Sequence, residues 1–376
     1  MNAFNNPGAQ DPVLARLIDQ VMTARAAQGA FEIRGHGSKR FYGELPRGEV
    51  LDTRVLTGIS SYEPTELVVT VRAGTPLQEL EAALAAQGQY LAFEPPRFQG
   101  EGGTGTVGGM VAAGLAGPSR AAVGSVRDYV LGATMLTGKG EVVSFGGQVM
   151  KNVAGYDVAR MLAGSMGFLG LICEVSLKVL PMPVATRTLR FAVDQAQALK
   201  RLNAWGGQPL PVNASAWWNN TLVVRLSGAR AAVDAATAGL GGEVLDDAAA
   251  AAFWLGLRDQ RDDFFQLAHT AVLQGGGRAL WRLSVPQVAA PLDELGGNQL
   301  VEWGGAQRWL LTETPAAQVR DAARRAGGHA VLFAAQDKSA GVLAPLSAPL
   351  ARIHKQLKTA FDPDRVFNPG RLYADL

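Results

Sequence analysis

The chain has 376 residues, which is more than one ordinary domain needs, so about two domains are expected. Its 35 Lys and Arg are balanced by 33 Asp and Glu, and this excludes a general nucleic-acid surface, which needs a basic excess. The single cysteine excludes a disulfide framework and a protein-ligated iron–sulfur cluster, and the four scattered histidines lack metal-ligand spacing.

The N-terminal residues lack the basic and apolar regions of a signal peptide, and no apolar run approaches the ~20 residues that span a bilayer. We therefore expect a cytoplasmic protein without a transmembrane segment.

The first predicted elements are a helix and a short strand that runs into a glycine loop. Asp11 and Pro12 can start the helix, and apolar residues recur at helical spacing up to Met22. The strand at residues 31–34 continues into the sequence GHGSK. That loop is either an anion-binding loop, with Arg34 and Lys39 neutralising phosphate, or a turn with solvated charges.

A second strand is predicted at residues 66–71, followed by a helix with favourable capping chemistry. Thr75 is expected as its N-cap, Pro76 at the first helical position and Gln78 at the third. Leucines at helical spacing form the buried face of this helix.

Six glycines lie between residues 100 and 109, with Thr104 and Thr106 among them. Glycine allows backbone to approach a ligand closely, and successive backbone N–H groups can bind an anion. A tight structural turn explains the same glycines equally well.

A hairpin is predicted next, with strands at residues 129–136 and 141–145, and then a short helix at residues 158–163 capped by Asp157. Residues 171–179 alternate as a half-buried strand that puts Cys173 on the apolar face, which indicates an inert core thiol rather than a nucleophile. Pro181 and Pro183 mark a domain boundary.

The following segment has an α+β order and no recognisable chemical motif, so we expect a sheet with helices on one face. Strands are predicted at 186–193, 214–218, 221–226, 279–285, 308–312 and 330–333, and helices at 194–202, 229–238, 247–257 and 317–326. Its seven tryptophans are expected in the core or at an interface rather than around a ligand. The last segment is a helix followed by two X-Pro turns, whose stiff path suits docking against another part of the chain.

Four blocks of sequence resemble the FAD-binding family of vanillyl-alcohol oxidase and p-cresol methylhydroxylase and, within it, the FAD-binding E subunits of bacterial glycolate oxidase (glycolate dehydrogenase). The blocks are residues 33–43, 105–128, 151–172 and 362–371, in the order and spacing of the family.

The resemblance implies an α+β fold: an FAD-binding domain of two subdomains at residues 1–184, a ferredoxin-like α+β cap domain at 185–345, and a C-terminal segment at 346–376 that returns to the first domain. It also implies which residues bind FAD. The first loop would wrap the pyrophosphate, the second loop and the segment after it would line the flavin, and later residues would reach the adenine end and the flavin side. These residues are Arg34, Gly35, His36, Gly37, Ser38 and Lys39; Thr104, Gly105, Thr106, Gly108 and Gly109; Gly117, Arg120, Gly124 and Val126; and Gly170, Ile172, Asn368 and Arg371.

Two departures from the family pattern matter. Members that bind flavin covalently often have histidine where this chain has Ser38, so non-covalent FAD is predicted; His36 is expected to be a loop histidine held by a backbone hydrogen bond. Relatives that oxidise 2-hydroxy acids carry histidine-rich segments that bind a metal, and nothing similar occurs here. No catalytic residue or metal site is therefore assigned, although Arg225, Arg278, Arg282 or Arg371 could bind a carboxylate.

The resemblance implies a subunit of a complex that oxidises glycolate to glyoxylate, together with a paralogous larger FAD subunit and an iron–sulfur subunit, associated peripherally with the inner membrane. Two alternatives remain open from the residues. One is a self-sufficient FAD oxidase of an alcohol or 2-hydroxy acid, and the other is a scaffold that binds no FAD.

Overall fold

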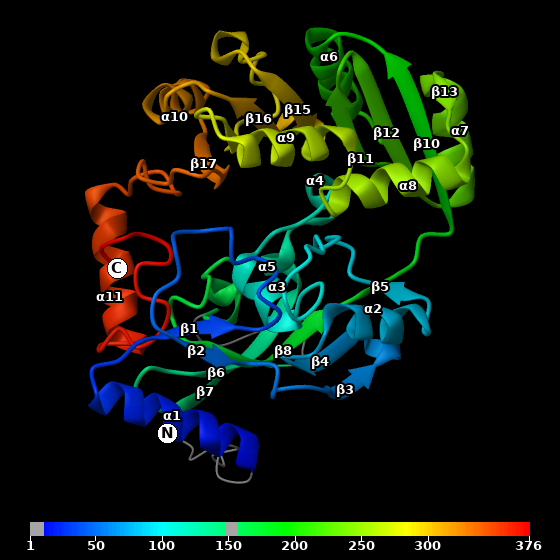
Figure 1. Ribbon diagram of the computed structural model, residues 1–376. Coiled ribbons are helices and arrows are strands. Elements are labelled where there is room, and N and C mark those ends of the chain that lie inside the picture. Colours follow the sequence, from blue (N-terminus) through cyan, green and yellow to red (C-terminus); the bar gives the residue numbers. More distant parts are fainter. Residues whose placement is uncertain (1–10, 148–156) are drawn as a thin grey trace.

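The computed structural model describes residues 11–147 and 157–376, so residues 151–156 of the resemblance block 151–172 lie outside the described residues. Figure 1 shows two sheets stacked one above the other, with the long helix near the C-terminus along one side. Helix α1 (Pro12–Ala26) lies at the bottom, and Asp11 caps it as predicted by accepting a hydrogen bond from the Val13 amide at 2.9 Å.

The lower sheet has five strands in the order β3-β4-β8-β6-β7, and every neighbouring pair is antiparallel. The strands are β3 (Ile59–Glu63), β4 (Val68–Arg72), β6 (Val130–Leu136), β7 (Val142–Gly146) and β8 (Leu171–Lys178). Valines and leucines of β4 and β8 join one core with α2 (Leu77–Ala85) and α3 (Val107–Ala113). The predicted hairpin at 129–145 is therefore confirmed, and Cys173 is buried as expected.

The capping predicted for α2 is wrong. Pro76 occupies the N-cap position, and the Thr75 hydroxyl instead accepts from the Gly58 amide at 3.0 Å and donates to the Gly58 carbonyl at 3.2 Å. The Leu77 amide donates to the carbonyl of Gly105, so the glycine-rich loop itself satisfies the start of α2.

A small parallel pair, β1 (Phe31–Arg34) with β2 (Glu49–Asp52), lies beside the five-stranded sheet. The C-terminal segment docks on it: the Phe31 amide donates to Val366, and the Asn368 amide donates back to Phe31. This confirms that the stiff tail lies against another part of the chain.

The upper sheet has eight strands in the order β13-β10-β12-β11-β15-β16-β14-β17. The first half runs β10-α6-β11-β12-α7-β13, and the second runs β14-β15-β16-α10-β17. Each half has the strand order of a ferredoxin-like unit, and β11 and β15 join the two halves edge to edge. The strands are β10 (Ala185–Ala192), β11 (Val212–Trp218), β12 (Thr221–Gly228), β13 (Glu243–Val244), β14 (Ala279–Ser284), β15 (Asn298–Glu302), β16 (Gln307–Thr312) and β17 (His329–Ala334).

Helices cover both faces of this sheet, so the expectation of helices on one face is wrong. Helices α6 (Gln195–Gly206), α7 (Arg230–Leu240) and α10 (Ala316–Arg325) pack on one face. Helices α8 (Asp247–Arg258) and α9 (Asp263–Gln274) pack on the face turned toward the lower sheet. Helix α9 and strand β15 were not predicted, and the predicted helix at 158–163 is a short 3₁₀ helix, η3 (Ala159–Leu162).

The remaining elements are short apart from the last helix. They are α4 (Arg120–Val123), α5 (Val126–Tyr129), α11 (Ala348–Phe361), β5 (Gln89–Tyr90), β9 (Leu180–Pro181), η2 (Pro64–Glu66), η4 (Asp293–Leu295) and η5 (Trp303–Gly305). Within the described ranges, no helix is both long and apolar enough to cross a bilayer.

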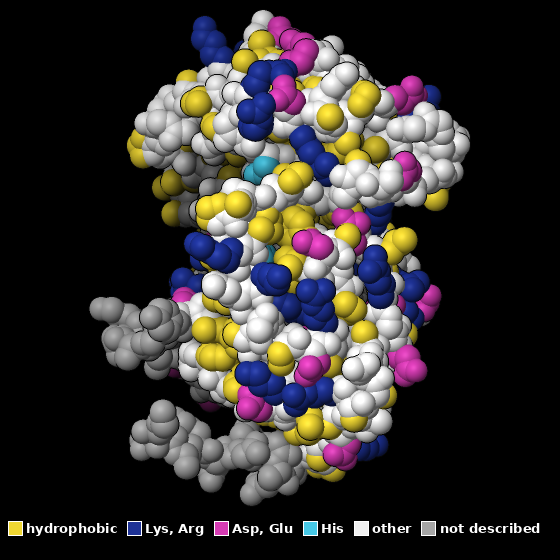
Figure 2. All heavy atoms as spheres, turned by 90° about the vertical axis from the view of Figure 1, so that its left-hand side faces the viewer, with side chains coloured by type: hydrophobic (Ala, Val, Ile, Leu, Met, Phe, Trp, Pro, Cys, Tyr) yellow, Lys and Arg dark blue, Asp and Glu magenta, His cyan; other side chains and the backbone are white. Residues whose placement is uncertain are grey.

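Polar contacts join the two sheets. The Trp303 indole donates to the Gly117 carbonyl at 3.0 Å, and Arg225 pairs with Glu94 at 2.7 Å. Figure 2 shows the same two-part molecule from the side of α11, with hydrophobic side chains visible between the upper and lower parts. The division at residues 184 and 345 remains a prediction, and it falls where the chain passes from one sheet to the other.

Candidate functional site

A cavity with about 870 Å³ of empty space, including its open mouth, lies beside β1. Its walls come from the loop after β1, the start of α3, the segment before β8 and the C-terminal tail. Three of these walls are rich in glycine, so much of the lining is backbone.

The two glycine loops that the sequence singled out meet at this cavity. A Cβ atom at Gly35 would lie 2.5 Å from the Thr106 hydroxyl, and the Gly105 amide donates to His36 Nδ1 at 3.2 Å. His36 is therefore the loop histidine held by a backbone bond that we expected. Burial, followed by the charge of Arg54, lowers its pKa.

The first loop offers unused backbone donors to the cavity. Among the described residues, the amides of His36, Gly37, Ser38 and Lys39 have no hydrogen-bond acceptor. Gly37 has φ +67, a left-handed conformation that suits glycine. Four consecutive free amides around such a residue suit an anion, and phosphate above all.

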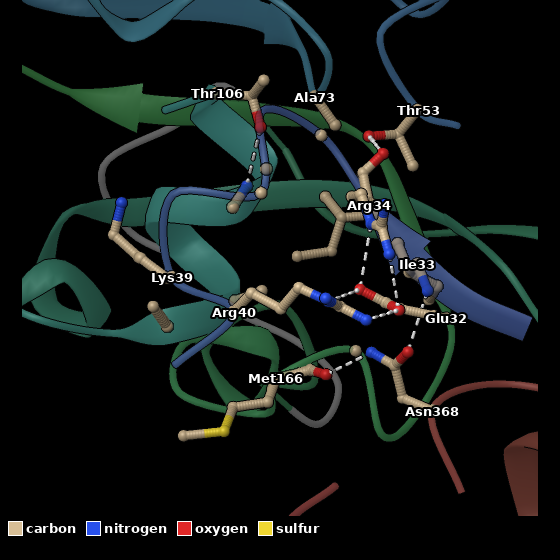
Figure 3. Close-up of a pocket in the computed structure, with 18 of the residues that line it drawn as sticks. Glu32, Ile33, Arg34, Lys39, Arg40, Thr53, Ala73, Thr106, Met166 and Asn368 are labelled. Carbon is tan, nitrogen blue, oxygen red and sulfur yellow. Dashed lines mark hydrogen bonds and ion pairs between the residues drawn. The ribbon is translucent and has the colours of Figure 1, made fainter. Parts of the chain in front are cut away.

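The buried carboxylate of Glu32 forms ion pairs with two nearby arginines (Figure 3). Arg34 and Arg40 each bind both oxygens of Glu32, with Arg34 at 3.0 and 2.8 Å. Burial alone would raise the pKa of Glu32, but the hydrogen bonds from Arg34 and Arg40 outweigh it and lower this pKa. Arg34 thus lines the cavity with its charge already paired with Glu32, and its role toward phosphate stays a prediction.

Lys39 brings a buried positive charge to this cavity. Its ammonium group is buried and has no hydrogen-bond acceptor among the described residues, and it lies 5.7 Å from the centre of the Phe98 ring. Burial lowers its pKa to about 8, although the charge of Asp259 acts in the opposite direction. A buried ammonium group without a counter-ion is costly, so it fits a site that binds an anion.

The tail completes the cavity wall. Asn368 accepts from the Ile33 amide at 2.8 Å and donates to the Met166 carbonyl at 2.6 Å, as Figure 3 shows. Arg371 donates to the carbonyls of Tyr42 at 2.5 Å and Arg40 at 3.0 Å. Its donors are occupied by backbone, so Arg371 holds the loop in place.

The structure brings most of the predicted FAD-binding residues together and leaves others outside the cavity. Those that line it are Arg34, Gly35, His36, Gly37, Ser38, Lys39, Thr106, Gly108, Gly109, Gly170, Ile172, Asn368 and Arg371. Thr104, Gly105, Gly117, Arg120, Gly124 and Val126 do not line it.

The segment from Gly117 to Val126 begins against the upper sheet and ends in the core of the lower one. Arg120 stacks 4.5 Å from the centre of the Trp303 ring, and the Val126 side chain is buried in the core of the lower sheet. These residues do not line the cavity beside β1, and their contact with FAD stays a prediction.

Sequence reasoning missed several lining residues, including Glu32, Arg40, Ala73 and Met166. Glu32 and Arg40 directly flank the first glycine loop, so their charges were an available signal. Ala73 and Met166 had no such signal in the sequence, because only the tertiary fold brings them to the cavity.

The donor set fits a dinucleotide: free amides and a free lysine suit phosphates, and a glycine-lined slot with apolar walls suits flat rings. Residues 14–146 match the family described as the FAD binding domain. A solved structure of alkyldihydroxyacetonephosphate synthase has a TM-score of 0.66 at 15% identity, covering 94% of this chain and 75% of that one. The fold is that of FAD-binding proteins of the vanillyl-alcohol oxidase and p-cresol methylhydroxylase type.

Similarity over the whole chain narrows this class. The chain is 48% identical over 360 residues to glycolate oxidase subunit GlcE of Escherichia coli, covering 96% of this chain and 97% of that protein. Glycolate oxidase subunit GlcD of Bacillus subtilis is 30% identical over 167 residues, which are 44% of this chain and 35% of that protein. The chain belongs to the GlcE family of glycolate oxidase subunits.

Proposed function

We propose that this chain is the FAD-binding subunit of a glycolate dehydrogenase complex that oxidises glycolate to glyoxylate. The observation that carries the proposal is the convergence of two glycine loops on one anion-binding cavity, in a chain similar to GlcE along almost its whole length.

The residues of the cavity have separate tasks in this proposal. The free amides of residues 36–39 and the ammonium group of Lys39 bind the negative charge of the dinucleotide. The Glu32–Arg34–Arg40 cluster and Arg371 hold the loop in shape. Bound FAD supplies two-electron chemistry, and the chain positions it and keeps water from it.

The proposed attachment of FAD is non-covalent. Ser38 stands where covalent members of the wider family often have histidine, and Ser38 is almost fully buried in the loop. His36 is the neighbouring alternative nucleophile, and its Nδ1 already accepts a hydrogen bond from Gly105.

The proposed partners are a paralogous larger FAD subunit, of which GlcD is an example, and an iron–sulfur subunit. One cysteine is too few to ligate an iron–sulfur cluster, so electrons that leave this chain pass to a group on another subunit. Peripheral association with the inner membrane would then be made through the partners.

Absorbance of the purified chain tests cofactor binding. We expect visible flavin bands, and we expect acid denaturation followed by filtration to release all the flavin from the protein. A purified, folded chain without flavin bands would favour the scaffold alternative and overturn the proposal. Flavin retained on the denatured protein would overturn non-covalent attachment alone.

Anaerobic mixing with glycolate tests the role of the chain. In a complex in which the larger subunit oxidises glycolate, the flavin of the isolated chain stays oxidised, and it bleaches when the larger subunit is added. Bleaching of the isolated chain at a turnover-competent rate would favour the self-sufficient oxidase.

A further inference from the structure

A covering segment, residues 95–103, lies against the loop that carries Lys39. The Gly102 amide donates to the His36 carbonyl at 3.3 Å, and a Cβ atom at Gly100 would lie only 2.2 Å from the same carbonyl oxygen. The two stretches of backbone are therefore in direct contact. A shift of the covering segment must change the surroundings of the loop, because closely packed groups cannot move independently.

Phe98 of the covering segment packs beside the ammonium group of Lys39. Its ring centre lies 5.7 Å from that group, and it packs edge to face on Phe41 at 5.3 Å. Phe41 in turn packs on Phe333 of β17 at 5.4 Å. The Lys39 side chain extends away from the ion pairs of Glu32 (Figure 3). An aromatic ring in this position excludes water from the ammonium group, and a charge in a dry site attracts an anion more strongly.

One hydrogen bond anchors the covering segment to the upper part of the molecule. The Arg97 amide donates to Asp259 Oδ1 at 3.0 Å, and Asp259 lies in the turn between α8 and α9 with only 7% of its surface exposed. Among the described residues, this is the only hydrogen bond that the backbone of residues 95–99 makes. A segment with so few backbone bonds opens easily once its anchor is removed.

Asp259 is itself held firmly in the turn. Arg258 donates to both of its oxygens, at 2.8 and 2.9 Å. The Arg97 side chain pairs with Glu81 of α2 at 3.3 Å, so Arg97 contacts the upper part with its amide and the lower part with its side chain. Burial lowers the pKa of Lys39 and the charge of Asp259 opposes this effect, so Asp259 is also close enough to interact with Lys39.

We propose that Asp259 is a positioning residue for FAD binding: through the Arg97 amide it holds the covering segment in place, so that Phe98 keeps water from Lys39. The inference rests on the proposed function, in which Lys39 binds negative charge of the dinucleotide. Salt screens a buried ion pair much less than an exposed one, so the salt dependence of FAD affinity reports whether Lys39 stays dry.

The test is equilibrium dialysis of FAD with the purified chain at low and high salt. We expect the wild-type Kd to change less than about twofold between about 0.05 and 0.5 M NaCl. Asp259→Ala should raise the Kd about tenfold at low salt and make it clearly salt-dependent, because water and ions then reach Lys39. A wild-type Kd and salt dependence in Asp259→Ala would overturn the proposal.

A double-mutant cycle separates this role from a merely structural one. In a Lys39→Met chain the charge that Asp259 protects is gone, so adding Asp259→Ala should raise the Kd for FAD by less than about twofold. If Asp259→Ala costs the same factor with and without Lys39, the two residues act independently and the proposal is wrong.

Two further variants serve as controls. Asp262→Ala removes another carboxylate of the same turn, which caps α9 by accepting from the Phe265 amide at 3.0 Å. It should lower stability and leave FAD affinity and its salt dependence unchanged. Asp259→Asn keeps an oxygen that can accept from the Arg97 amide, so most of the affinity should return. An equal loss in Asp262→Ala, or no recovery in Asp259→Asn, would contradict the assigned role.

The two levels of the argument fail differently. A wild-type chain that binds no FAD would overturn the proposed function and this inference with it. A chain that binds FAD equally well with and without the Asp259 side chain would overturn this inference alone.

Discussion

Gly37 shows how a single backbone conformation can decide cofactor binding. It has φ +67 and lines the cavity, and a Cβ atom there would contact only Arg34 Cδ, at 3.9 Å. We expect Gly37→Val to fold and to lower FAD affinity at least tenfold, the equivalent of ~1.4 kcal/mol, because a branched side chain resists this φ and projects into the cavity. Equilibrium dialysis of FAD measures the loss.

The matched control is Gly276→Val, since Gly276 has φ +74 and open space around it, far along the chain from the cavity loops. It introduces the same backbone strain of about 1–2 kcal/mol without touching the site. If both variants lose FAD to the same extent, the loss reports strain and not the cavity.

The free charge on Lys39 predicts an unusual pH dependence. Its pKa is lowered from 10.5 to about 8, chiefly by burial, so between these values the unfolded chain binds more protons than the folded chain. Stability of the flavin-free chain should therefore rise with pH across this range, and the full penalty applies below pH 8. We expect Lys39→Met to stabilise the flavin-free chain at pH 7 by up to about 3 kcal/mol and to have no such effect above pH ~10.5, in urea unfolding.

Lys338→Met is the control of opposite sign. Lys338 is also partly buried, but its ammonium group donates to the carbonyls of Phe41 and Gly43, so its removal should destabilise the chain. Should Lys39→Met destabilise the flavin-free chain at pH 7 as Lys338→Met does, the claim that Lys39 lacks a partner is wrong.

The two glycine loops could be predicted from the sequence because their glycines are close together along the chain. The structural reason for each glycine could not be predicted in this way. Gly108 resembles Gly37 in the sequence, yet a Cβ atom at Gly108 would lie 2.6 Å from the Cβ of Ala73, so packing alone already requires a glycine there.

Among the elements, the C-terminal tail depends on one buried ion pair. Lys358 on α11 lies 2.7 Å from Asp362 and also donates to the carbonyls of Phe168 and Phe367, at 2.8 and 2.7 Å. We expect Lys358→Met to cost about 3–5 kcal/mol, because it leaves the Asp362 carboxylate buried without its counter-ion. Urea unfolding measures this loss of stability. Lower FAD affinity should accompany it, since the tail carries Asn368 and Arg371.

A second ion pair of the same tail provides the comparison. Arg25 and Asp364 are both more than a third exposed, and exposed pairs contribute at most about 1 kcal/mol. Arg25→Met should therefore be nearly silent. An equal cost for the two variants would contradict a special role for the buried pair.

The elements that sequence reasoning missed differ in how visible they were. Helix α9 had a clear signal, since Asp262 caps it and its buried residues, such as Phe264, Phe265 and Ala268, recur at helical spacing. Strand β15 had almost no sequence signal, because it is only five residues long. Its pairing with β11 and β16 identifies it as a strand. The strand order of the upper sheet follows from such long-range pairing and could not be read from local pattern.

At the scale of the whole molecule, the upper and lower sheets can be followed by separate optical signals. All seven tryptophans lie between residues 205 and 309, so tryptophan fluorescence reports on the upper sheet, while flavin absorbance reports on the lower one. In the flavin-containing wild-type chain the two signals should change together in urea, as in a single cooperative transition.

The ion pair Arg225–Glu94 joins the upper and lower parts, so removing it tests whether the two parts unfold together. Arg225 also stacks on the Trp254 ring at 5.0 Å and donates to Asn213 at 2.7 Å, so it is fixed on the upper sheet while Glu94 belongs to the lower part. We expect Glu94→Gln to cost about 1–3 kcal/mol and to separate the tryptophan and flavin transitions. Asp247→Asn breaks an exposed pair with Arg187 inside the upper part and should leave the transitions coincident. Transitions that stay coincident in Glu94→Gln would show that this pair does not couple the two sheets.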